Sequence, residues 1–249
     1  MSLLGLQRDG SGPVLVWLHG FTQTKDSGRT FRSILAGTHQ VLTIDLPGHG
    51  ENSEISASLD ETADLLASAL PSEPFTLGGY SMGGRVALHF AWRHRERLSS
   101  LIVLSATLGI RDDDERDARR ARDNALADRV ELIGAQAFLD EWLAQPMFAT
   151  LPDDPLERAA RSRDARGLAN SLRNVGTGTQ EWLGEQLSSV TVPALIMAGS
   201  NDTKFVGEAR RLHDALVNSN ASFVPDAGHA AHLERPDEVA ALIASVQPQ

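Results

Sequence analysis

A serine flanked by glycines is the residue whose setting in this sequence most clearly suggests chemistry. Gly79-Tyr80-Ser81-Met82-Gly83 reads G-x-S-x-G, between a predicted strand at Phe75-Thr76-Leu77 and a predicted helix from Met82 to about Trp92. Glycines on both sides permit a tight strand-to-helix turn, because neighbouring Cβ atoms would collide there. The pattern predicts a serine exposed at the carboxyl edge of a sheet. An ordinary Gly-rich turn, without function, is the alternative.

A serine hydroxyl is a weak nucleophile or base at neutral pH, so it requires an imidazole and an orienting carboxylate. Asp202 and His229 each follow a predicted strand, and with Ser81 they give the chain order serine, acid, histidine. Because the carboxyl ends of parallel strands share one edge of a sheet, we expect the three side chains to meet. Two alternatives remain: Asp202 as a simple helix cap, and Asp112 or Asp113 as the acid.

A negative oxygen formed beside Ser81 would need hydrogen-bond donors. One candidate is the backbone N–H of Met82, directly after the serine, and the other is the N–H of Phe21, in the loop after an apolar strand. Loss of one such donor typically costs about 10²–10³ in rate. The sequence therefore predicts an oxyanion hole built from the amides of Phe21 and Met82.

Apolar runs separated by helical patterns must position these residues. The runs predict buried strands at 14–18, 41–46, 75–77, 101–105, 194–198 and 221–224. Helical patterns occupy about 59–70, 205–217 and 236–246, besides the helix after Ser81. This alternation predicts an α/β fold, a mainly parallel sheet with helices on both faces.

Residues 108–188 differ from the rest, because helical periodicity and charge dominate there without a convincing strand. We interpret this stretch as a helical cap inserted into a core formed by residues 1–107 and 189–249. We refer to residues 108–188 as the cap segment.

Composition narrows the classes of function. The 249 residues are 41% hydrophobic and 22% charged, with a net charge of −10, which disfavours nucleic-acid and anionic-membrane binding. The chain has no cysteine, no H-E-x-x-H and no P-loop, so we expect no cofactor and no metal. No signal peptide or membrane span is recognisable, and we expect a cytoplasmic protein. The oligomeric state is not indicated.

Several stretches together carry a family resemblance that covers nearly the whole chain. The chain resembles the α/β-hydrolase superfamily in these stretches: His19-Gly20-Phe21, Asp45-Leu46-Pro47-Gly48-His49-Gly50, the serine turn, Asp202 and Gly228-His229. Within this superfamily, the chain resembles the 2-succinyl-6-hydroxy-2,4-cyclohexadiene-1-carboxylate synthases of menaquinone biosynthesis. The stretches that carry this resemblance are Gly83-Gly84-Arg85, residues 141–148, residues 172–178 and Asp202-Thr203-Lys204-Phe205.

This resemblance implies an α/β-hydrolase fold and a lyase that eliminates pyruvate from an enolpyruvyl cyclohexene carboxylate. Serine would act as a base that His229 and Asp202 activate, without an acyl-enzyme. A serine hydrolase acting on an ester or a C–C bond of a small acid is the alternative, because the same triad supports both reactions. A non-catalytic binding module on the same fold is a third reading.

A substrate with three carboxylates implies several arginines in the pocket, since arginine binds carboxylates bidentately. Arg85 lies one helical turn beyond Ser81, and the family pattern adds Arg120 and Arg161. Arg163 competes with Arg161, because the spacing differs from the family by one residue. A solvated surface is the alternative for Arg85 and Arg120. The pattern also implies apolar pocket walls, or else cap-core packing, at Trp142 and Phe148.

Overall fold

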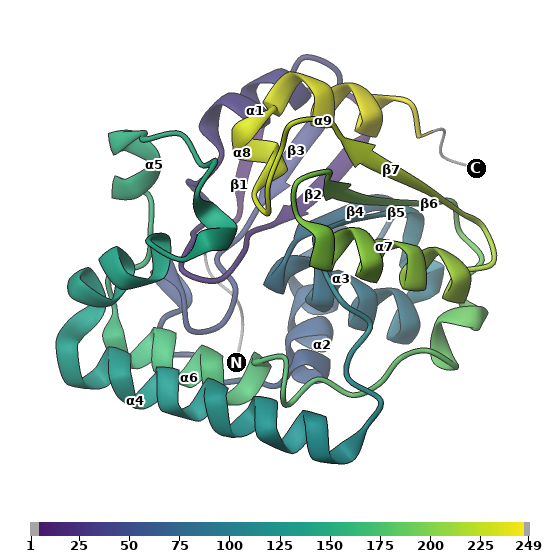
Figure 1. Cartoon of the computed structure of the whole chain (residues 1–249). Coiled ribbons are helices and arrows are strands. Elements are labelled where there is room, and N and C mark those ends of the chain that lie inside the picture. Colours follow the sequence, from purple (N-terminus) through teal and green to yellow (C-terminus); the bar gives the residue numbers. More distant parts are fainter. Residues whose placement is uncertain (1–4, 247–249) are drawn as a thin grey trace.

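A computed structural model of the chain describes residues 5–246, and its centre is a seven-stranded sheet (Figure 1). The strand order is β1-β3-β2-β4-β5-β6-β7. The strands are β1 (Gln7–Asp9), β2 (Val14–Leu18), β3 (Gln40–Thr43), β4 (Phe75–Tyr80), β5 (Leu98–Leu104), β6 (Ala194–Gly199) and β7 (Ser219–Val224). Only the pairing of β1 with β3 is antiparallel among the described strands, so the predicted mainly parallel sheet is confirmed.

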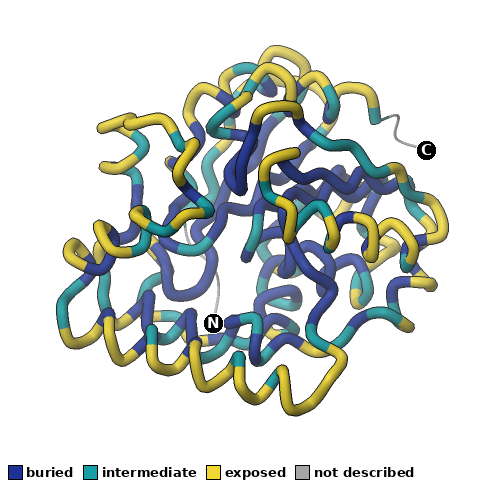
Figure 2. Tube along the Cα trace, viewed as in Figure 1, coloured by how far each residue is buried: buried dark blue, intermediate teal, exposed yellow. Residues whose placement is uncertain are grey.

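Helices pack on both faces of this sheet, as the alternating pattern predicted. They are α1 (Arg29–Leu35), α2 (Leu59–Ala69), α3 (Met82–Arg93), α7 (Thr203–Ala215), α8 (Ala231–Glu234) and α9 (Pro236–Ala244). Alternate residues of β2 enter different apolar clusters: Val16 packs with residues of α2, α3 and α7, whereas Leu15 and Trp17 pack with residues of α1, α8 and α9. Burial on both faces explains why the strands read as continuous apolar runs (Figure 2).

The pairing register brings the ends of the functional strands to one edge. Leu18 pairs with Gly79, Tyr80 pairs with Leu104, and Gly199 pairs with Val224. The residues that follow β2, β4, β6 and β7 therefore meet at the carboxyl edge of the sheet. This edge is where ligands bind in parallel α/β sheets.

The cap segment contributes a layer of helices over that edge (Figure 1). It contains α4 (Asp113–Leu143), α5 (Pro155–Ala159) and α6 (Ala165–Val175). The helices α4 and α6 pack side by side around a small apolar cluster that includes Phe138, Leu168 and Leu172. The division into a core and a cap at residues 108 and 188 stays a prediction.

Local sequence signals explain several element boundaries. A capping box joins Ser58 and Glu61 at the start of α2, with hydrogen bonds of 3.3 and 2.8 Å. The strand β3 ends at Thr43, earlier than predicted, although Ile44 and Leu46 remain buried. The apolar run extends beyond the strand because these residues are buried without being part of it.

Within residues 5–246, no helix is long and apolar enough to cross a membrane.

Candidate active site

The turn at Ser81 depends on its flanking glycines. The backbone of Ser81 has φ +52°, a value that residues with a Cβ rarely adopt. Ser81 is the single residue between the end of β4 and the start of α3. A Cβ on Gly79 would lie 2.3 Å from the carbonyl oxygen of Gly83, and a Cβ on Gly83 would lie 2.3 Å from that of Leu18. No other residue fits at either position without displacing backbone.

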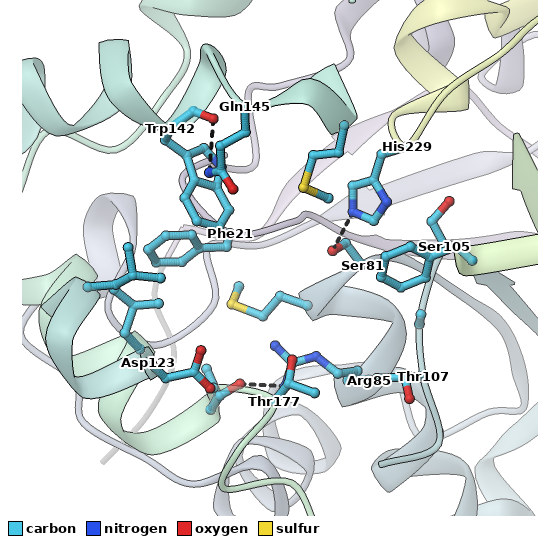
Figure 3. Close-up of a pocket in the computed structure, with 18 of the residues that line it drawn as sticks. Phe21, Ser81, Arg85, Ser105, Thr107, Asp123, Trp142, Gln145, Thr177 and His229 are labelled. Atoms are coloured by element: carbon cyan, nitrogen blue, oxygen red, sulfur yellow. Dashed lines mark hydrogen bonds between the residues drawn. The ribbon is translucent and has the colours of Figure 1, made fainter. Parts of the chain in front are cut away.

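Ser81, His229 and Asp202 form one hydrogen-bonded chain, although 148 residues separate the first two. The Ser81 hydroxyl lies 3.0 Å from Nε2 of His229 (Figure 3). On the other side of the ring, Nδ1 of His229 lies 2.8 Å from Oδ2 of Asp202. The other oxygen of Asp202 accepts the N–H of Phe205 at 3.3 Å and so caps α7. The helix-cap role and the imidazole-orienting role of Asp202 therefore coexist.

The electrostatics favour a neutral imidazole. Burial lowers the pKa of His229 below its ordinary value of 6.5, and the hydrogen bond from Nδ1 to Asp202 opposes this shift only in part. With its Nδ1–H donated to the Asp202 carboxylate, the neutral ring carries at Nε2 the lone pair that can accept the Ser81 proton. The arrangement can therefore remove a proton from Ser81 at neutral pH.

The rival acids from the sequence, Asp112 and Asp113, lie elsewhere, and so does the buried His232. Asp112 is exposed and caps α4, and Asp113 forms an ion pair with Arg116 on the surface. His232 is buried behind Tyr80, with their ring centroids 4.4 Å apart, and it does not line the cavity beside Ser81.

A cavity of about 410 Å³, here the main cavity, opens beside Ser81 and His229 (Figure 3). Phe21, Trp142 and Phe148 line it, and the Trp142 ring lies 5.1 Å from that of Phe21. Met82 lines it as well. Among the residues that the structure describes, no acceptor takes the N–H of Phe21 or Met82. Both amides remain available to an oxygen in the cavity.

Cationic side chains also line the main cavity. Arg85 is buried, donates to the carbonyl oxygen of Val175, and has a pKa lowered to about 10, chiefly by burial and then by Arg119. It keeps its charge at neutral pH. Arg119, Arg122 and Lys204 also line the cavity. The cavity is suited to an anionic ligand.

The structure corrects one predicted pocket residue. Arg120 is exposed, pairs with Asp117 at 2.7 Å, and does not line the main cavity. Each residue turns an α-helix by about 100°, so the neighbours Arg119 and Arg122, three residues apart, share the inward face instead. Asp123 is buried in the cavity wall and holds Nε of Arg119 at 2.8 Å.

Arg161 and Arg163, the two alternatives for one pocket arginine, differ in burial. Arg161 is buried and donates to the Thr22 hydroxyl at 2.7 Å, whereas Arg163 is exposed and bonds Gln136. Arg161 lines a second cavity of about 190 Å³ rather than the main cavity. Phe148 lines both cavities and lies at their boundary.

Sequence reasoning missed Tyr80, Asp123 and Lys204 as cavity residues, and among the arginines of one cap helix it selected Arg120 instead of Arg119 or Arg122. Lys204 carried a usable signal, because it comes two residues after the acid at the start of α7. The arginines of α4 had no such signal, since charged residues surround them on every face. Within the described part of the chain, no group of three His, Asp or Glu side chains could hold a metal ion.

Comparisons with known proteins agree with this fold. The sequence profile of the alpha/beta hydrolase family matches residues 15–242. The chain belongs to the alpha/beta hydrolase family. This alpha/beta hydrolase is 31% identical to the solved structure of MenH from S. aureus, with a TM-score of 0.89 over 98% of this chain and 97% of that one.

Two curated relatives of this alpha/beta hydrolase carry related names. A Photorhabdus laumondii protein named 2-succinyl-6-hydroxy-2,4-cyclohexadiene-1-carboxylate synthase is 33% identical over 239 residues, 93% of this chain and 84% of that protein. A Bacillus subtilis protein, whose name gives it as a candidate for the same activity, is 37% identical over 235 residues, 89% of this chain and 85% of that protein.

Proposed function

We infer that the chain is a 2-succinyl-6-hydroxy-2,4-cyclohexadiene-1-carboxylate synthase, a lyase of menaquinone biosynthesis. Its substrate is 2-succinyl-5-enolpyruvyl-6-hydroxy-3-cyclohexene-1-carboxylate, from which it eliminates pyruvate. The relatives support this function by their names and by 33–37% identity over most of the chain. The observation that carries it is one cavity that joins a serine–histidine–aspartate chain to the buried Arg85 and the half-buried Arg119.

The proposed mechanism uses Ser81 as the base. His229, oriented by Asp202, takes the hydroxyl proton as Ser81 Oγ removes the proton on the ring carbon next to the succinyl ketone. The electrons form a ring double bond, the existing double bond shifts, and the carbon–oxygen bond to the enolpyruvyl group breaks. The leaving group takes up a proton and becomes pyruvate. The Phe21 and Met82 amides would stabilise the developing enolate oxygen.

The cationic wall provides the substrate-binding part of the proposal. Arg85 and Arg119 lie in the main cavity, and each guanidinium suits a carboxylate. Trp142 and Phe148 would supply apolar surface against the ring. Arg161 would bind a carboxylate only if the substrate extends past Phe148 into the second cavity. A cytoplasmic location and a freely diffusing anionic substrate belong to the same proposal.

A serine hydrolase acting on an ester or C–C bond is the second candidate. The favouring observation is the Ser81 hydroxyl itself, which is hydrogen-bonded to a neutral imidazole and open to the cavity, as an acylation nucleophile must be. Formation of an acyl-enzyme separates this candidate from the lyase.

A pyruvate-coupled assay with the enolpyruvyl substrate tests the proposal. Wild-type protein should release one pyruvate per diene formed, and Ser81→Ala should lower kcat by about 10³-fold or more. Burst kinetics with p-nitrophenyl acetate should reveal no accumulating acyl-enzyme. If wild-type protein releases no pyruvate but hydrolyses the ester with a burst, the proposed lyase function is wrong and the hydrolase function takes its place.

A further inference from the structure

We propose that His19 is a positioning residue that holds the Gly20–Phe21 peptide so that the Phe21 N–H points into the main cavity. This inference rests on the proposed function, in which the Phe21 amide stabilises an oxyanion. It assigns to His19 a role at a distance, since His19 does not line the cavity.

The decisive contacts are on the carbonyl side of that peptide. The carbonyl oxygen of Gly20 accepts a hydrogen bond from Nδ1 of His19 at 2.9 Å and another from the backbone N–H of Gln23 at 3.1 Å. A trans peptide is planar, with its C=O and N–H pointing in opposite directions. Two donors on the Gly20 oxygen therefore fix the direction of the Phe21 N–H.

His19 can donate in this way because its other ring nitrogen is occupied. Nε2 accepts the backbone N–H of Leu46 at 3.0 Å, in the loop after β3. An imidazole that accepts at Nε2 and donates at Nδ1 is the neutral Nδ1–H tautomer. Burial lowers the pKa of His19 to about 4, so this form persists at neutral pH. The loop after β3 thus determines which nitrogen of His19 faces Gly20.

The peptides on either side of the Phe21 amide are also held. The N–H of Gly20 donates to Oε1 of Gln23 at 2.8 Å, and the N–H of Thr22 donates to Nε2 of His49 at 3.3 Å. Thr22 has φ +69°, a strained value for a residue with a Cβ. Of three successive amides, the middle one has no protein acceptor among the described residues.

The consequence of losing the His19 donor follows from peptide geometry. If the Gly20–Phe21 peptide rotates, the Phe21 N–H leaves the cavity and the Gly20 carbonyl turns towards it. A carbonyl oxygen would repel the developing enolate, where an amide would stabilise it. Because the effect is confined to the charged transition state, it should lower kcat and leave KM nearly unchanged.

Three substitutions separate this role from simple packing. His19→Asn places an amide nitrogen where Nδ1 lies and keeps the donor to Gly20, but it loses the acceptor for Leu46. His19→Leu has nearly the same shape as Asn and lacks both. His19→Gln reaches the Leu46 N–H with an acceptor and lacks the donor to Gly20.

In the pyruvate-release assay we expect His19→Asn to keep kcat within about threefold of wild type. The Leu and Gln variants should lose about 10–100-fold in kcat, with KM within about threefold, a loss bounded by that of a whole oxyanion donor. Thermal melting of each variant measures its stability. If the Leu variant does not fold, the comparison of Asn with Gln decides in its place.

Equal kcat losses in the Asn, Leu and Gln variants would overturn the proposal, as would losses that follow melting temperature. A failure of the proposed function is distinguishable, because wild-type protein would then release no pyruvate. In that case the same variants are compared in p-nitrophenyl acetate hydrolysis, whose tetrahedral oxyanion needs the same amides. The ranking expected there is unchanged.

Discussion

Arg119 and Arg120 illustrate at the residue scale how one position along a helix changes the chemistry of a side chain. Arg119 lines the main cavity and is held by the buried carboxylate of Asp123, while Arg120 extends into solvent and pairs with Asp117. Asp123 holds Nε of Arg119, and no residue of the described range 5–246 accepts from its terminal nitrogens, which can therefore meet a carboxylate. Surface ion pairs such as that of Arg120 contribute little to stability.

These two neighbours provide a matched test of substrate binding. Arg119→Ala should raise KM for the tricarboxylate by about 10–100-fold, the loss expected for one charge-assisted interaction of about 1.5–3 kcal/mol. Arg120→Ala should change KM less than about twofold. Steady-state kinetics of both variants measure the difference, and an equal effect in the two would contradict the assignment of Arg119 to the cavity.

The helix α4 shows at the element scale that a continuous charged pattern can conceal a break. The stretch 113–143 is helical, but Gly134 has φ +80° and ψ +159°, so α4 consists of two segments with a kink between them. The second segment places Phe138 in the apolar cluster of the cap and Trp142 in the wall of the main cavity. A straight helix would direct these aromatic side chains elsewhere.

Two glycines in helices make this interpretation testable. A Cβ added to Gly134 or to Gly207 of α7 would meet no atom within 4 Å, so space is not the difference between them. Gly134→Ala should destabilise the protein by about 1–3 kcal/mol, because its backbone region is almost confined to glycine. Gly207→Ala should stabilise it by about 0.4–1 kcal/mol. Denaturant unfolding measures both, and a stabilising Gly134→Ala would mean that α4 can straighten without cost.

Buried neutral histidines couple the whole molecule to pH. Burial lowers the pKa values of His19, His49 and His232 to about 4, 3 and 3, from 6.5 in the unfolded chain. A depressed pKa means that the unfolded chain binds protons first. Stability is therefore fully present above pH 6.5 and falls as the pH drops towards 4 and 3.

Denaturant unfolding at pH 7.5 and 5.5 should show this loss. Each histidine lowers the free energy of unfolding by about 1.4 kcal/mol for every pH unit below 6.5, until the pH reaches its pKa in the folded protein. His232→Phe removes one of the three, in a site lined by the rings of Trp17, Phe31 and Tyr80. The variant should therefore show a shallower loss of stability with falling pH. A free energy of unfolding that rises on acidification would contradict the assignment of neutral buried histidines.

The sequence by itself determined the strand–helix alternation, the turn at Ser81 and the positions of Asp202 and His229 after their strands. Each of these depends on local spacing, and parallel strands of known order bring their carboxyl ends together. Short elements with weak patterns were not predicted: β1, α1 and α8 have three, seven and four residues.

Tertiary structure decided which side chains of the cap face the cavity. Helix-forming propensity is the same for Arg119 and Arg120, and only the packing of α4 against α6 selects the inward face. Likewise, the sequence placed Phe21 in a loop, but two contacts from the loop after β3 hold its neighbours: the Thr22 N–H donates to His49, and the His19 ring accepts the Leu46 N–H, each pair being 27 residues apart in the chain. Interactions between residues distant in the chain set these orientations, because local backbone preferences leave several of them open.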